Sequence, residues 1–155
     1  MGGGALLRDG NTIIEYFAVK WHPDDAGHLG VKIGEPSGQT FWEYATLVLG
    51  LHAWGDWFVE QSLAVLGDNT GSLQDALHLK GRGALLALSR ELSWRQSRCR
   101  WQFAVGHVPS AHNDVADCLS RLHAKPPKKF PYELLSDAME VRAPTIRSLW
   151  RVEVP

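Results

Sequence analysis

The chain has 155 residues, 45% of them hydrophobic, so it is long enough for one domain with a core and too short for two large ones. Sixteen Lys and Arg residues oppose seventeen Asp and Glu residues, which excludes a global basic field, so any nucleic-acid binding must come from a local patch. The two cysteines form no CxxC pair, which argues against a disulfide framework or a structural zinc site. No apolar run approaches the roughly 20 residues that span a bilayer. The first residues also lack the pattern of a signal peptide, so we expect a soluble intracellular protein without membrane contact.

The first predicted elements are two antiparallel strands, at residues 5–8 and 12–19, joined by a tight turn at residues 9–11. Residues 21–38 are rich in Gly, Pro and Asp, which predicts a loop. A helix from Phe41 to Trp54, begun by Thr40, carries apolar residues almost all round its axis. This helix is therefore predicted to be buried on more than one side.

The second half of the sequence predicts further strands and helices in alternation. A buried strand at residues 61–67 ends at Asp68, and a helix follows from Leu73 to about Leu79. The remaining elements are a helix at 84–96, with leucines at helical spacing, a strand at 100–105 and a short helix at 113–122. This order predicts an α/β domain with a mixed sheet flanked by helices over residues 1–122. Residues 123–155 contain Pro and Lys and are predicted to form a C-terminal tail, docked or loose, with at most one short helix near 134–139.

Three carboxylates lie at positions where a catalytic role is plausible. Each position is also explained by an ordinary structural role, such as a helix cap, a turn or a solvated helix surface. Glu43 lies near the start of the buried helix, where Thr40-x-x-Glu43 matches a capping box. Asp68 ends a buried strand and equally suits a helix N-cap or a turn. Asp117 lies in the last helix of the domain, where a carboxylate is usually solvated. His107 follows a strand and, taken alone, is more often a packed or surface histidine than a catalyst.

The joint placement of these residues favours a shared site. A mixed α/β sheet brings groups from strand ends and adjacent helices to one cleft, so the three carboxylates are predicted to converge. Hard cations such as Mg²⁺ or Mn²⁺ would offset their repulsion. Two such ions about 4 Å apart activate a water and stabilise the leaving oxygen in phosphodiester cleavage. His107 would serve in proton transfer near the leaving group.

Five segments of the sequence carry a family resemblance. They are Gly2–Leu7, Trp42–Ala45, Leu66–Asn69, Gly106–His107 and Asn113–Arg121. With these segments the chain resembles a ribonuclease H type 1 domain of a retrotransposon reverse transcriptase, over about residues 2–122. The resemblance implies an RNase H-like fold and cleavage of the RNA strand of RNA·DNA hybrids. It assigns Glu43, Asp68 and Asp117 as metal ligands and His107 as a mobile catalytic histidine, and it assigns Asn69 and Asn113 as neighbours that touch the hybrid or orient the loop.

A basic stretch between residues 80 and 101 matches a further feature of this family, a basic helical region that grips the substrate. Across it only Glu91 opposes six cations, which are Lys80, Arg82, Arg90, Arg95, Arg98 and Arg100. Such a local excess suits phosphate contacts, and we take Arg82, Arg95 and Arg98 as candidate nucleic-acid-binding residues. Trp94 and Trp101 either add stacking or lie in the core, and an ordinary solvated helix face is the alternative explanation.

The sequence departs from the family pattern at its front. Family members carry a strand with an aspartate before the glycine run, whereas Met1 directly precedes that run here. The resemblance therefore predicts a first strand that is missing or incomplete, and a sheet that is split or that places the Ala5 strand directly beside the Leu63 strand. It also predicts weak binding of Mg²⁺ or Mn²⁺, because a bridging carboxylate is absent.

Three functional hypotheses follow. The first is an RNase H-like domain from a retroelement polyprotein, impaired in two-metal hydrolysis. Its missing aspartate either belongs to residues lost from this sequence or is supplied by a longer chain, for example one with an upstream reverse transcriptase domain. The second is a non-catalytic remnant that binds nucleic acid or only retains the fold. The third is an unrelated α/β interaction domain in which Glu43 and Asp68 are helix caps.

Overall fold

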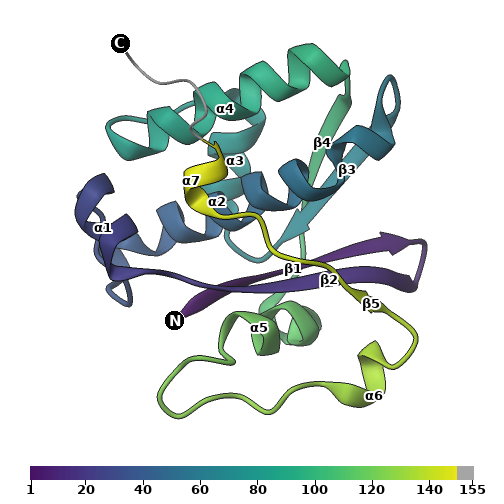
Figure 1. The fold of residues 1–155 in the computed structure, drawn as a ribbon. Coiled ribbons are helices and arrows are strands. Elements are labelled where there is room, and N and C mark those ends of the chain that lie inside the picture. Colours follow the sequence, from purple (N-terminus) through teal and green to yellow (C-terminus); the bar gives the residue numbers. More distant parts are fainter. Residues whose placement is uncertain (150–155) are drawn as a thin grey trace.

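The computed structural model describes residues 1–149, and it shows an α/β architecture with helices on both faces of a mixed sheet (Figure 1). Strands β1 (Gly2–Asp9) and β2 (Thr12–Lys20) form the predicted antiparallel hairpin, which turns at Gly10 with φ +58°. Strand β5 (Met139–Glu140) adds to β2 in parallel. The predicted fold class, a mixed sheet flanked by helices, is confirmed.

A second sheet is separate from the first. Strands β3 (Ser62–Gly67) and β4 (Gln102–His107) pair with each other in parallel. In residues 1–149 no strand pairs with both β1 and β3, so the strand orders are β1-β2-β5 and β3-β4. Of the two arrangements predicted from the sequence, the split sheet is the one observed, and the Ala5 strand does not pair with the Leu63 strand.

The helices up to Ser120 are α1 (Pro23–Leu29), α2 (Pro36–Trp54), η1 (Gly55–Phe58), α3 (Thr70–His78), α4 (Ala84–Cys99), η2 (Ser110–His112) and α5 (Asp114–Ser120). In Figure 1 the helices α2, α3 and α4 lie above the hairpin with the second sheet, whereas α5 lies below the hairpin. Two predictions at the front are corrected. Residues 21–38 are not all loop, because α1 begins with Pro23 at its first turn and the His22 ring accepts a bond from the Asp24 amide at 3.2 Å. Helix α2 begins at Pro36 and not at Thr40, since proline suits a first helical turn.

Helix α2 forms the centre of the core. Ten of its 19 residues are buried, on every side of the helix, as the sequence predicted. The Phe17 ring of β2 packs on Trp54 with centroids 5.3 Å apart, and the Trp54 indole donates a 2.8 Å hydrogen bond to the buried carboxylate of Glu15. On the other side, buried Trp101 donates to the carbonyl of Gly55 at 3.0 Å. Of the two positions considered for Trp101, the core position is therefore the observed one.

The glycine run at the start of β1 lets helices approach both faces of the hairpin. A Cβ on Gly3 would lie 2.9 Å from the Trp21 ring and in contact with Thr46 of α2. A Cβ on Gly4, which faces the opposite side, would lie 2.8 Å from the Ala116 carbonyl of α5. Helices α2 and α5 therefore cover opposite faces of β1, as Figure 1 shows.

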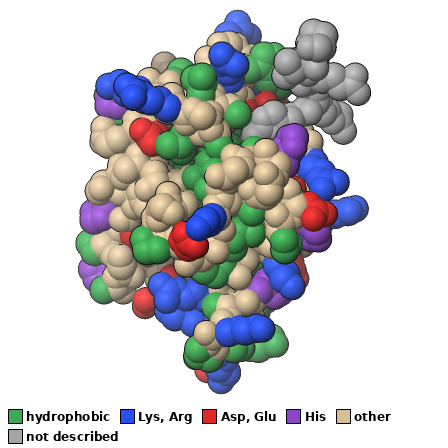
Figure 2. Space-filling view, turned by 90° about the vertical axis from the view of Figure 1, so that its left-hand side faces the viewer, with side chains coloured by type: hydrophobic (Ala, Val, Ile, Leu, Met, Phe, Trp, Pro, Cys, Tyr) green, Lys and Arg blue, Asp and Glu red, His purple; other side chains and the backbone are tan. Residues whose placement is uncertain are grey.

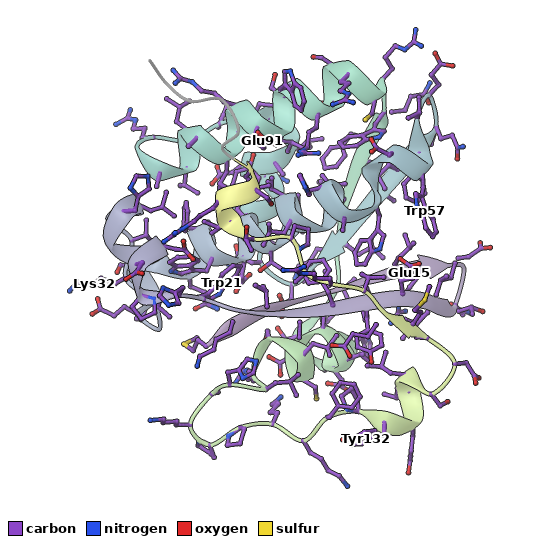
Figure 3. All side chains as sticks on the ribbon, viewed as in Figure 1. Glu15, Trp21, Lys32, Trp57, Glu91 and Tyr132 are labelled. Atoms are coloured by element: carbon purple, nitrogen blue, oxygen red, sulfur yellow. The ribbon has the colours of Figure 1, made fainter. Side chains whose placement is uncertain are left out.

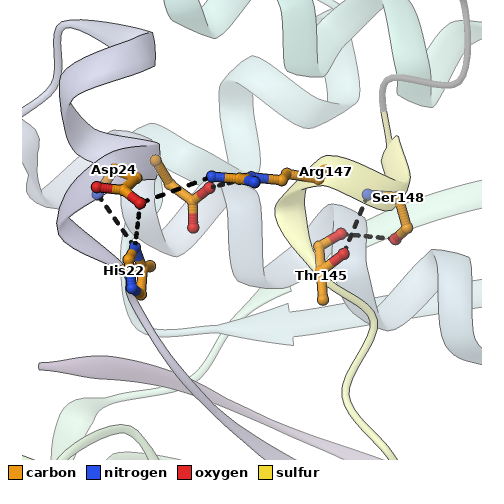
Figure 4. Close-up of polar contacts among 6 residues, drawn as sticks. His22, Asp24, Thr145, Arg147 and Ser148 are labelled. Carbon is orange, nitrogen blue, oxygen red and sulfur yellow. Dashed lines mark hydrogen bonds and ion pairs between the residues drawn. The ribbon is translucent and has the colours of Figure 1, made fainter.

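Residues 123–149 form a docked segment, which we call the C-terminal strap. It contains α6 (Tyr132–Leu135), β5 and α7 (Ile146–Leu149), and it runs below α5 and back across β2. Leu135, Ile146 and Leu149 are buried, and Arg147 forms ion pairs with Asp24 and Asp25 of α1 at 3.9 and 3.5 Å (Figure 4). The short helix predicted near 134–139 is observed slightly earlier; residues 150–155 of the predicted tail lie outside the described residues.

None of the helices within residues 1–149 has the combination of length and apolar character that a bilayer crossing requires.

We predict that Gly4→Ala destabilises the fold. The added methyl group would meet the Ala116 carbonyl and the Leu119 side chain of α5, and such overpacking costs about 1–3 kcal/mol of unfolding free energy. Urea denaturation measures the change. Gly27→Ala is the matched control, because a Cβ there meets nothing within 4 Å. Equal stability of the two variants would contradict the close approach of α5 to β1.

Candidate functional site

The carboxyl ends of β3 and β4 bring two of the predicted site residues to one edge of a sheet. Gly67 pairs in register with His107, and the Val108 amide donates to the Gly67 carbonyl at 2.8 Å. Asp68 follows Gly67 directly, so it lies beside the exposed His107. Parallel strands end at the same edge of a sheet, and functional groups commonly gather there.

Glu43 of α2 joins Asp68 at this edge. The Gln39 amide donates to Glu43 Oε1 at 2.9 Å, and the side chain of Asn69 is also within hydrogen-bonding reach of Glu43. Burial raises the pKa of the Glu43 carboxyl, the negative charge of Asp68 raises it further, and the bonds from Gln39 and Asn69 oppose the rise. Asp68 is therefore close enough for its charge to act on Glu43. We refer to Glu43, Asp68, Asn69 and His107 as the strand-end site.

The helix caps predicted at Glu43 and Asp68 are not observed, whereas Asp68 does lie at a bend between β3 and α3. The N-cap of α3 is Asn69, whose Oδ1 accepts the Ser72 amide at 2.9 Å, so Asp68 does not cap this helix. Helix α2 begins at Pro36, which places Glu43 beyond its first turn and removes the predicted capping box with Thr40. Neither carboxylate is needed to cap a helix.

Asp117 is not part of the strand-end site. It lies on α5, where it forms a 2.7 Å ion pair with Arg121 and a second ion pair with Lys128 of the C-terminal strap. Within residues 1–149 no three His, Cys, Asp or Glu side chains are grouped so that they could hold a metal ion. The predicted convergence of Glu43, Asp68 and Asp117 is therefore not observed. The residues present do not fit a pair of divalent ions, because two carboxylates and an amide offer too few oxygen ligands.

The packing explains this separation. Helix α5 lies on the face of β1 opposite α2, and β1 has no ladder to β3. Asn113 precedes α5 and accepts the Asp117 amide at 3.0 Å through its carbonyl, so it holds the start of that helix. Its predicted contact with nucleic acid remains a prediction.

The basic residues predicted on and near α4 differ in how exposed they are, and therefore in whether they could contact a nucleic acid. Arg82 and Arg98 are exposed, and Arg98 lies over the ring of Trp94, 5.3 Å from its centroid; the Trp94 side chain is 52% exposed. Arg95 is mostly buried, and its guanidinium bonds to Glu91 at 2.7 Å and to His52. Arg95 therefore ties α4 to α2, which leaves Arg98 and Trp94 as the outward-facing pair.

The charge on the surface is mixed. Figure 2 shows one face of the molecule, on which Lys and Arg side chains alternate with Asp, Glu and His. This mixture of charges agrees with the formal net charge of -1. Any binding of nucleic acid would therefore depend on a local group of basic residues and not on a positive potential over the whole molecule.

Sequence reasoning missed two groups of residues on the C-terminal strap. The first is Lys128, which forms an ion pair with Asp117. The only feature of the sequence that points to it is the Lys-Pro-Pro-Lys-Lys stretch at residues 125–129. The second is an aromatic group formed by Tyr16, Phe130 and Tyr132. Its signal was the Phe-Pro-Tyr tripeptide at residues 130–132, which is unusual in a predicted tail.

Comparisons with known proteins give one structural likeness. No family model matches the chain, and no curated protein matches its sequence. A solved structure of RNase H1 from the halophilic archaeon Halobacterium salinarum NRC-1 is similar at 20% sequence identity and a TM-score of 0.48, over 62% of this chain and 72% of that chain.

We predict that Glu43→Gln stabilises the protein at neutral pH and not at low pH. Because the folded-state pKa of Glu43 is raised, the wild type loses stability as pH rises through that pKa. Below the ordinary pKa of a glutamate the carboxyl is protonated in both states, so the advantage of Gln disappears. Thermal melts across pH measure this. Glu133→Gln, at an exposed position on α6, is the control. A gain that is independent of pH would contradict the burial and coupling of Glu43.

We predict that Lys128→Ala loosens the C-terminal strap. The ion pair with Asp117 holds the strap against α5, and loss of a surface pair accelerates local opening by roughly two- to fivefold. Hydrogen exchange at the Val141 amide, which donates to the Tyr16 carbonyl at 2.9 Å, reports this opening. Lys129→Ala is the matched control, and an equal effect of both variants would show that Asp117 does not anchor the strap.

Proposed function

We propose that this chain is an RNase H-like domain of the retroelement type that engages RNA·DNA hybrids, with hybrid cleavage impaired in the chain alone. The strand-end site is the observation that supports this proposal. Glu43 comes from a helix, Asp68 follows the end of β3, and His107 ends the neighbouring strand β4. The charge of Asp68 acts on Glu43, and Asp68 directly follows Gly67, the register partner of His107, while Asp117 lies apart.

The impairment follows from the number of carboxylates. Glu43 and Asp68 alone are expected to bind Mg²⁺ or Mn²⁺ weakly, since hard cations require more oxygen ligands. A further carboxylate at this edge would have to come from an added strand. Among residues 1–149, β1 and β3 each pair with a strand on one side only, so each has an edge available for such a strand. We propose that a longer chain, including an upstream reverse transcriptase domain, supplies it.

The remaining residues have proposed roles toward the hybrid. His107 is exposed beside Asp68 and would transfer a proton near the leaving oxygen. Arg82 and Arg98 would contact phosphates, while Trp94 would present a stacking face. Asn69 and Asn113 would orient the strand-end site and the loop that leads to α5. Arg95 supports this face through its bonds to Glu91.

The retroelement origin rests on the sequence around the last helix. The run from Asn113 to Arg121 resembles the corresponding run of retroelement RNase H domains. In the structure, α5 presents Asp117 and Arg121 as a pair, and Val115 and Leu119 as its buried face against the hairpin. The spacing of this motif therefore also serves the packing of α5.

A non-catalytic nucleic-acid-binding protein is the second candidate. The observation that favours it is the pairing of Asp117 with Arg121 and Lys128, because both cations compensate the charge that a metal would otherwise compensate. In that case the exposed Arg98 and Trp94 would remain functional and the strand-end site would not.

Hybrid binding tests the shared part of both candidates. We expect salt-sensitive binding of an RNA·DNA hybrid, and Arg98→Glu should weaken it by roughly three- to tenfold because a phosphate contact becomes repulsive. Fluorescence anisotropy measures the affinity. Arg8→Glu makes the same charge change at an exposed position of the hairpin and should leave binding nearly unchanged. Equal losses in the two variants would contradict a binding face on α4.

Cleavage separates the two candidates. The chain alone, in Mg²⁺ or Mn²⁺, should cut the RNA strand no faster than its Asp68→Asn variant. A version that carries a short β-forming extension with one aspartate ahead of Gly2 should gain cleavage that Asp68→Asn abolishes. The same extension with asparagine is the control. If the aspartate extension pairs with the sheet and yields no cleavage, the non-catalytic candidate is the correct one.

A further inference from the structure

The aromatic group on the C-terminal strap lines a cavity of about 470 Å³, away from the strand-end site. Its walls come from β2, α6, β5 and the strap residues that precede α6. The lining residues are Tyr16, Phe130, Tyr132, Leu135, Ser136, Ala138 and Glu140. The volume lies within the range of roughly 300–1,000 Å³ that small-molecule sites occupy. Figure 3 places Tyr132 on the outer side of this segment.

The three rings are arranged as walls and not as a stack. Tyr16 and Phe130 have centroids 5.9 Å apart with planes inclined by 56°, and Phe130 and Tyr132 have centroids 4.7 Å apart with planes inclined by 59°. All three rings line the cavity. Tyr16 is buried and fixed by the β2 ladder, whereas the Tyr132 side chain is 70% exposed and forms the outer wall.

A carboxylate completes the cavity. Glu140 of β5 is in parallel register with Tyr16, and registered residues of adjacent strands project from the same face of a sheet. The negative charge of Glu140 acts on the Tyr16 hydroxyl, where it adds to burial in raising the pKa of Tyr16. Among the described residues that line the cavity, none is Lys, Arg or His. Residues 130–140 hold three acidic side chains and no basic one.

Aromatic faces and an uncompensated carboxylate together define the ligand. Ring faces carry negative quadrupole charge and attract cations, and they offer no strong hydrogen-bond acceptor to replace the water around a primary ammonium. A cation whose nitrogen carries methyl groups has little hydration to lose, so it suits such a site. We propose that Tyr16, Phe130, Tyr132 and Glu140 form a binding site for a quaternary ammonium group, as borne by choline or by a trimethylated lysine side chain.

Choline and its neutral carbon isostere, dimethylbutanol, test the charge requirement. Titrations followed by NMR at the ring resonances of Tyr16 and Tyr132 should give saturable binding of choline in the millimolar range. The isostere has the same shape without the charge, and it should bind at least about fivefold more weakly. Equal binding of choline and dimethylbutanol would overturn the proposal. A parallel titration with trimethyl-lysine identifies which carrier of the group the site prefers.

Variants test the residues. Tyr132→Ala and Glu140→Gln should each weaken choline binding by roughly two- to fivefold, whereas Tyr132→Phe should retain it. Both positions are exposed, so the fold should be kept. Leu134→Ala is the matched control, because Leu134 is 60% exposed on the same helix and does not line the cavity. If Leu134→Ala weakens binding as much as Tyr132→Ala, the aromatic group is not the site.

Discussion

The burial of α2 on every side is the constraint on which the other elements depend. The two sheets share no ladder, so their relative position is set through this helix. At its carboxyl end Trp54 meets Glu15 and Phe17 of the hairpin, and the following Gly55 accepts the Trp101 indole beside β4. Such packing fixes the position of one sheet relative to the other as effectively as a shared strand would, because protein interiors are close-packed and resist small displacements. Glu43 therefore reaches Asp68 although its helix is bound chiefly to the other sheet and to its neighbouring helices.

The same arrangement explains why the three candidate carboxylates have different surroundings. Glu43 and Asp68 are close, and their mutual repulsion is eased by the amides of Gln39 and Asn69 and by a raised pKa at Glu43. Asp117 lies across the hairpin on α5, where Arg121 and Lys128 compensate it. Glu43 and Asp117 thus each have local partners that ease the burial of their charge. A cation added at the strand-end site would oppose the effects of burial and of Asp68, which both raise the pKa of Glu43.

The parts of the fold that sequence periodicity predicts are those whose burial is local. The hairpin, β3, β4 and α4 follow from alternation, a short apolar run or leucines at helical spacing, and the surrounded α2 follows from its apolar circumference. The Thr40 capping pattern predicts too late a start for α2, which begins at Pro36. The glycines of residues 21–38 predict a loop where Pro23 begins α1. The sequence does not decide whether the C-terminal strap is docked or loose, because its position depends on residues far away in the sequence. Lys128 contacts Asp117, and Phe130 contacts Tyr16. No local pattern encodes those contacts.

The C-terminal strap makes the hairpin and α5 a closed unit. Its β5 pairs with the outer edge of β2, its Leu135 packs with Tyr16 and Leu119, and its Lys128 compensates Asp117. The strap thereby pairs with Glu15 and Tyr16 at the outer edge of β2 and supplies a cation for Asp117. The other edge of β1 and the free edge of β3 have no partner strand among residues 1–149, so backbone groups there retain the capacity to pair. At β1 a further strand could pair only on the side away from β2, because β2 lies between β1 and β5.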